Sequence, residues 1–164
     1  MRTASVNGMT CFLIGTFYAV VMAAQHNIPL AAVGLLAAGA GAIELHGLGR
    51  LRQGDPGGMN SLLLAQPLML AVILGYCVLR VTHFEMPTTS EWLMEQATLT
   101  AKELEITVEE YFRVVNRLSM QILAIVGVVY QGLMLRYYLR RREEVRRALE
   151  EYWGEREDSG AGRD

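Results

Sequence analysis

Residues 29–48 read PLAAVGLLAAGAGAIELHGL, and Glu44 is the only Asp, Glu, Lys or Arg among them. The length of this stretch matches the roughly 20 apolar residues that a helix needs to cross the hydrocarbon core of a membrane. Three further apolar stretches, at residues 9–25, 61–82 and 118–135, are of similar length. The sequence therefore predicts an all-α membrane protein, built as a bundle of four transmembrane helices in a single membrane domain.

The charged residues between the four spans predict an orientation. The basic residues gather in three places, namely Arg2 before span 1, Arg50 and Arg52 after span 2, and Arg136, Arg140, Arg141, Arg142, Arg146 and Arg147 after span 4. The loop of residues 84–117 is instead rich in glutamate. Since Lys and Arg concentrate on the cytoplasmic side, we expect both termini in the cytoplasm and the acidic loop outside.

Two features of the sequence bear on the compartment. Lys102 is the only lysine beside many arginines, a bias that favours a GC-rich, bacterial coding sequence and hence the bacterial inner (plasma) membrane. The first span also fits a secretory signal peptide, because Val21-Met22-Ala23 resembles a cleavage site. We prefer an uncleaved first helix.

The two polar segments are expected to be helical. In the outer loop, the pairs Thr88/Glu91 and Thr107/Glu110 have the spacing of capping boxes. They predict an amphipathic helical hairpin over residues 88–117, although the alternation at residues 104–108 also fits a short strand. The segment 136–157 predicts a cytoplasmic helix that continues span 4, and residues 158–164 are expected to be disordered.

A polar layer near the cytoplasmic side is the best candidate site. Glu44, Gln66 and Gln131 lie on three different spans, each within roughly 6–8 Å of the inner boundary at 1.5 Å per residue. His46 and Arg136 lie at a similar depth. An ionisable residue at membrane depth is a functional hypothesis by default, so Glu44 is a candidate proton or cation ligand.

The alternative is a structural role for the same layer. In that interpretation, Glu44 pairs with Arg136, Arg50 or Arg52, and the glutamines hydrogen-bond between helices and fix their register. We favour this structural interpretation at the level of sequence, and we expect Glu44 to face the bundle interior in both cases.

A second polar set lies at the outer boundary, where His26 ends span 1 and Arg80 and His83 end span 3. Two histidines on different helices suit a metal or haem, but histidines at a membrane interface are ordinary and the paired mid-span histidines of haem proteins are missing. We therefore predict no metal and no cofactor. Arg80 is expected to extend outward toward Glu85 or the acidic hairpin.

Small residues form one face of span 2, and lipid contacts are expected elsewhere. The face consists of Gly34, Ala37, Ala38, Gly41 and Ala42. Such spacing lets helices approach closely, either within the chain or in a homo-oligomer. The arginine-rich segment 136–147 is expected to determine topology or to attract anionic lipid head groups.

The sequence excludes more functions than it predicts. A net charge of −2 gives no reason to expect a nucleic-acid partner, and Walker, dinucleotide, HExxH and CxxC motifs are absent. We expect a non-enzymatic membrane protein that acts in interaction or assembly. The alternative is a small oligomeric transporter or channel that uses the polar layer around Glu44.

Overall fold

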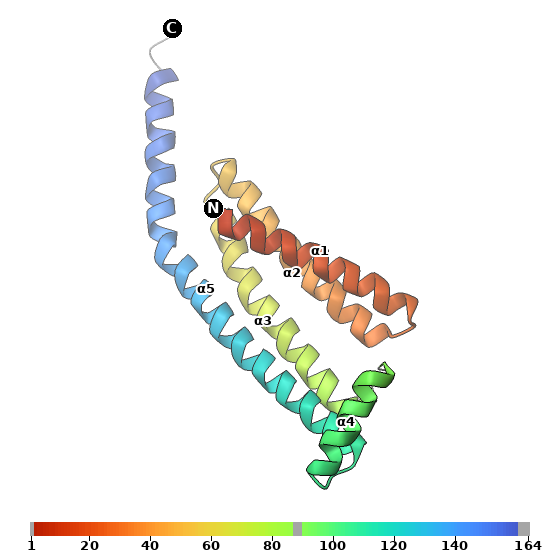
Figure 1. Ribbon diagram of the computed structural model, residues 1–164. Helices are drawn as coiled ribbons and strands as arrows, with labels where there is room; N and C mark the ends of the chain where they lie inside the picture. Colours follow the sequence, from red (N-terminus) through yellow and green to blue (C-terminus); the bar gives the residue numbers. More distant parts are fainter. Residues whose placement is uncertain (1, 87–89, 161–164) are drawn as a thin grey trace. The chain divides into compact units, whose positions relative to one another are not determined.

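A computed structural model describes residues 2–86 and 90–160 of the chain, with five helices and no strand in that part. The helices are α1 (Arg2–Ala24), α2 (Ile28–Arg52), α3 (Gly58–Thr82), α4 (Glu91–Glu103) and α5 (Val108–Gly160) (Figure 1). The all-helical prediction is confirmed, and a turn rather than a strand separates α4 from α5.

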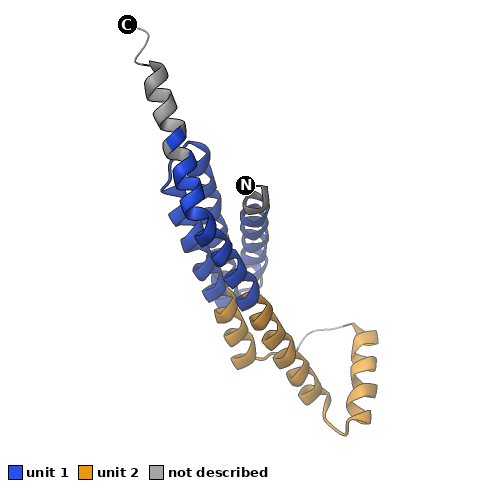
Figure 2. Cartoon of the chain, turned by 90° about the vertical axis from the view of Figure 1, so that its left-hand side faces the viewer, with its two compact units in different colours: residues 1–72, 128–164 blue, residues 73–127 orange. Residues whose placement is uncertain are grey.

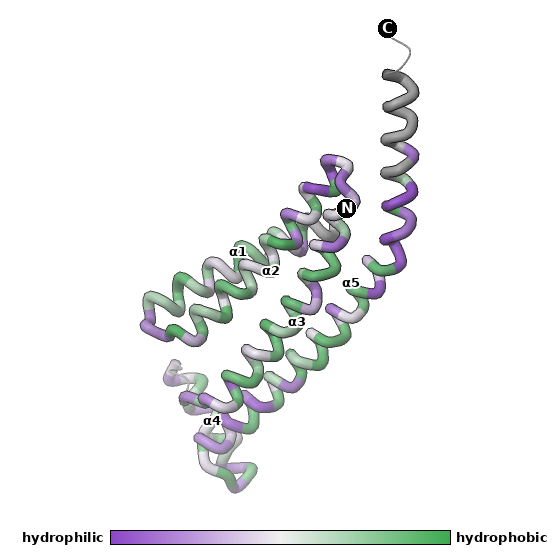
Figure 3. The backbone as a smooth tube through the Cα atoms, turned by 180° about the vertical axis from the view of Figure 1, so that it is seen from behind, coloured by the Kyte–Doolittle hydropathy of each residue, from purple (hydrophilic) through white to green (hydrophobic). Residues whose placement is uncertain are grey.

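Four of these helices, α1, α2, α3 and α5, are long and apolar enough to cross a membrane. Figure 3 shows that hydrophobic residues prevail along these helices. Many of their large apolar side chains are exposed, including Phe17 at 72%, Leu64 at 60% and Leu133 at 62%. Soluble monomers rarely expose contiguous apolar surface on this scale, whereas lipid would cover it. The helices are therefore compatible with a small multi-pass membrane protein.

The helices are longer than the spans expected from hydropathy. The helix α1 begins at Arg2, although the apolar stretch begins near Met9. Hydropathy marks the part of a helix that lipid tolerates, whereas backbone hydrogen bonds continue through polar residues such as Asn7.

The chain divides into two compact units (Figure 2). Unit 1 holds residues 1–72 and 128–164, and thus α1, α2, the first part of α3 and the second part of α5. Unit 2 holds residues 73–127, which include α4.

In unit 1, α1 packs along α2 at very close range. A Cβ atom added to Gly41 would lie 2.6 Å from the backbone nitrogen of Phe12, and one added to Gly34 would lie 2.6 Å from that of Ala19. A Cβ atom added to Gly15 of α1 would lie 2.6 Å from the backbone nitrogen of Ala38. The small-residue face of α2 is thus an intramolecular seam. Ala42, expected on this face, is exposed.

A tight turn joins α2 to α3. The Asp55 carboxylate accepts a hydrogen bond from the Gly57 N–H at 2.7 Å and forms a salt bridge with Arg50 at 2.6 Å. These two interactions hold the pKa of the Asp55 carboxyl below its usual range. Gly54 adopts φ 83°, which glycine tolerates at no steric cost.

In unit 2, the second predicted capping box is present. The Glu110 carboxylate accepts a hydrogen bond from the Thr107 N–H at 2.9 Å, and the Thr107 hydroxyl accepts one from the Glu110 N–H at 3.2 Å. This pair begins α5, as predicted. The other box is not tested because Thr88 lies outside the described residues. Ser90 precedes α4 without a side-chain hydrogen bond to its backbone.

The residues that α4 buries are small. Trp92, Leu93 and Leu99 are exposed, and Ala97 and Ala101, one turn apart, are the buried residues.

The helix α5 is a single element of 53 residues. It runs without a break through span 4, through the residues before that span and through the Arg- and Glu-rich segment after it. The helix reaches Gly160, into the segment expected to be disordered, and residues 161–164 lie outside the described part of the chain.

Candidate functional site

The carboxylate of Glu44 is the centre of a polar cluster inside unit 1. Glu44 lies on α2 and is 2% exposed. Its Oε2 accepts a hydrogen bond from the Asn7 amide of α1 at 2.8 Å, and its Oε1 accepts one from the Tyr138 hydroxyl of α5 at 3.0 Å. Three helices thus meet at one carboxyl group, and both of its oxygen atoms are bound by neutral donors.

The cluster extends beyond these three residues. The Tyr130 hydroxyl donates to Asn7 Oδ1 at 3.2 Å, which makes a continuous chain of hydrogen bonds from Tyr130 through Asn7 to Glu44. The side chain of Gln66 on α3 lies close to the same carboxylate. Four helices of unit 1 therefore contribute to the surroundings of Glu44.

Two amide oxygens in this layer have no hydrogen-bond partner in the described part of the chain. They are Oε1 of Gln66 and Oε1 of Gln131, on side chains that are 2% and 5% exposed. Burying an acceptor without a partner costs about 1–3 kcal/mol. Each of these amide oxygens can accept a hydrogen bond.

The arginines expected beside Glu44 do not bind it. Arg50 forms its salt bridge with Asp55, while Arg52 and Arg136 are exposed. Among the described side chains, no salt bridge involves Glu44. His46 is exposed as well, because it lies two residues from Glu44 and therefore on another face of α2. The predicted ion pair is thus replaced by hydrogen bonds from uncharged groups.

The residues of the outer-boundary set are divided between the units. His26 belongs to unit 1, where it lies in the turn after α1 in a left-handed conformation with φ 57°. Arg80 and His83 belong to unit 2, where the Arg80 carbonyl accepts a hydrogen bond from Asn116 at 2.9 Å. No salt bridge of Arg80 to Glu85 is formed within the described residues. Among those residues, no group of three or more His, Cys, Asp or Glu side chains is arranged to hold a metal ion.

Sequence reasoning missed Asn7, Tyr130 and Tyr138. Asn7 precedes the first apolar stretch, and Tyr138 follows the last one, so neither falls inside a predicted span. A signal for Tyr138 was present, because it lies seven residues from Gln131 and therefore on the same face of α5.

No known protein family, curated protein or solved structure matches this chain.

Proposed function

We propose that this chain is a small membrane protein of the transporter or channel class in which Glu44 takes up and releases a proton. The observation that carries this proposal is the buried Glu44 carboxylate, held by neutral donors from α1 and α5. A charged carboxylate at membrane depth is costly unless it is paired with a cation, and uptake of a proton removes that cost.

The partners of Glu44 suit both protonation states. The Tyr138 hydroxyl can donate to the carboxylate or turn and accept from the protonated acid, because a hydroxyl is both donor and acceptor. The unpartnered Oε1 atoms of Gln66 and Gln131 offer further acceptors in the same layer. An arginine in place of these groups would hold Glu44 in the charged form.

Proton flux into liposomes tests this function. Purified protein reconstituted with a pH-sensitive dye inside the vesicles should dissipate an imposed pH gradient. The variant Glu44→Gln should lose this activity, because an amide keeps the size of the side chain but cannot exchange the proton. Glu95→Gln, the same change at an exposed position of α4, should leave the flux unchanged.

The results of this assay also bear on a second function. If the wild-type protein carries no flux, or if Glu44→Gln retains it, the transport proposal is wrong. Interaction or assembly with another membrane protein would then be the better-supported role. That role draws support from α5, since about 20 of its 53 residues suffice to cross a membrane and the remainder extends beyond it.

We further propose that both termini face the cytoplasm, on the evidence of the arginine asymmetry. A cysteine introduced by Ser159→Cys should react with a membrane-impermeant maleimide only after the cells are permeabilised. The matched change Ser90→Cys, just before α4, should be labelled in intact cells. Labelling of Ser159→Cys in intact cells would reverse the proposed orientation.

A further inference from the structure

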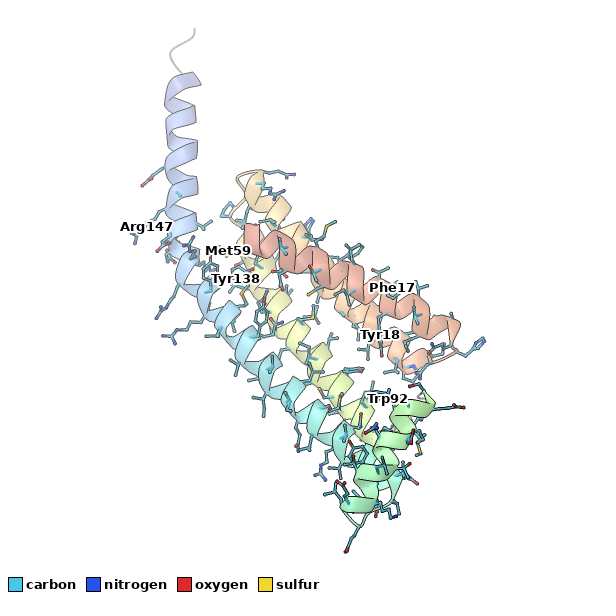
Figure 4. The ribbon with its side chains drawn as sticks, viewed as in Figure 1. Phe17, Tyr18, Met59, Trp92, Tyr138 and Arg147 are labelled. Carbon is cyan, nitrogen blue, oxygen red and sulfur yellow. The ribbon has the colours of Figure 1, made fainter. Side chains whose placement is uncertain are left out.

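A cavity of about 410 Å³ lies in unit 1, beside the cluster of buried apolar side chains. Its lining includes Leu48, Leu51, Met59, Leu62, Tyr138 and Val145. Figure 4 labels Met59 and Tyr138, which approach the cavity from α3 and α5. The volume falls within the range of about 300–1,000 Å³ that is common for sites of small molecules.

One side of the cavity is open to the surroundings of the protein. Leu133 and Tyr137 line it from α5 and are 62% and 43% exposed. Both are large and mainly apolar, so the entrance suits a hydrocarbon chain that arrives sideways from the membrane. Arg141, also in the lining, holds its guanidinium 5.2 Å from the centre of the Tyr137 ring.

A second, smaller cavity of about 190 Å³ adjoins the first and is basic. The two share Met59 and Val145 in their lining. The smaller one is lined by Arg142 and Arg146 of α5, by Gly57 just before α3, and by Asn60 in the first turn of α3. Arg146 also forms a salt bridge with Glu143 at 2.8 Å, so part of its charge is already compensated.

We propose that the two cavities together bind one anionic phospholipid. An acyl chain fills the apolar cavity, and the phosphate group lies against Arg142 and Arg146 in the basic one. The predicted spans end at residues 48 and 135, so the apolar cavity lies at the membrane boundary and the arginines lie just beyond it. That order, apolar and then basic, matches the order of acyl chain and head group in a lipid monolayer, and basic pockets between membrane helices are known to bind anionic head groups.

Native mass spectrometry in detergent tests the site with phosphatidylglycerol as the anionic probe and phosphatidylcholine as the zwitterionic one. The wild-type protein should bind one phosphatidylglycerol in clear preference to phosphatidylcholine. The double variant Arg142→Gln/Arg146→Gln should weaken phosphatidylglycerol binding about tenfold through loss of two charges at the membrane surface. Val145→Phe, which narrows both cavities, should weaken the binding of both lipids.

The control variant is Arg140→Gln/Arg147→Gln, which removes two charges from the same helix outside both cavities. Figure 4 shows Arg147 on the side of α5 away from α2 and α3. This control should keep wild-type affinity within about twofold. Equal losses in the two double variants would overturn the site, as would unchanged affinity in Arg142→Gln/Arg146→Gln. Binding of oleate in place of phosphatidylglycerol, at equal strength, would overturn the phospholipid as the occupant.

Discussion

Replacing Gly41 with leucine is expected to force α1 away from α2 and to destabilise the protein by about 3 kcal/mol or more. Overpacking in a close-packed interior typically costs about 1–3 kcal/mol, and side chains usually yield to relieve it. At Gly41 the obstacles are backbone atoms, namely the Phe12 nitrogen at 2.6 Å and the Gly8 carbonyl oxygen at 2.8 Å from an added Cβ. These backbone atoms belong to α1, so the helix as a whole must shift to make room for the leucine side chain.

Gly39 provides the matched control, because a Cβ atom added there meets nothing within 4 Å. Gly39→Leu makes the same change of residue in the same helix, and it should be neutral or slightly stabilising because leucine favours helix more than glycine does. Unfolding of the two variants in mixed micelles, followed by helical circular dichroism, measures the difference. Similar stability of Gly41→Leu and Gly39→Leu would show that α1 does not pack on this face.

The seam between α1 and α2 shows which part of the helix packing the sequence could predict. The spacing of Gly34, Ala38 and Gly41 indicates a close approach of helices but does not identify the partner. The partner is α1, where Gly8, Gly15 and Ala19 recur at intervals of seven and four residues. Large exposed residues such as Phe12 and Phe17 lie between these small residues, and they hide the spacing when hydropathy alone is considered.

For the candidate site, the sequence predicted the depth of the residues along their helices but not the direction in which they face. Counting residues from the span ends placed Glu44, Gln66 and Gln131 at one depth, since a helix rises by a fixed 1.5 Å per residue. The depth of a residue does not determine the direction in which its side chain leaves the helix, and this direction decides which groups the side chain contacts. Arg136 lies at a suitable depth but two residues from Tyr138, so it faces outward while Tyr138 reaches the carboxylate. The sequence predicted an arginine as the partner of Glu44, whereas in the structure the partner is the hydroxyl of Tyr138.

Removing that phenol hydroxyl is expected to have the second large effect. Tyr138→Phe keeps the ring that fills the core, but it deprives the buried carboxylate of the hydrogen bond at 3.0 Å. Leaving a buried polar group without its partner costs about 1–3 kcal/mol, and more where the group is charged. Tyr137→Phe deletes the same hydroxyl from the neighbouring residue, which is 43% exposed, and it should cost little.

A double-mutant cycle then assigns the loss to Glu44. In the Glu44→Gln background the side chain is neutral, and the penalty for losing one donor is smaller, so Tyr138→Phe should destabilise that variant less than it does the wild type. Coupling energies of about 0.5–3 kcal/mol are typical of residues in direct contact. Additive effects of the two changes, measured by the same unfolding assay, would mean that the Tyr138 hydroxyl stabilises the protein without acting through Glu44.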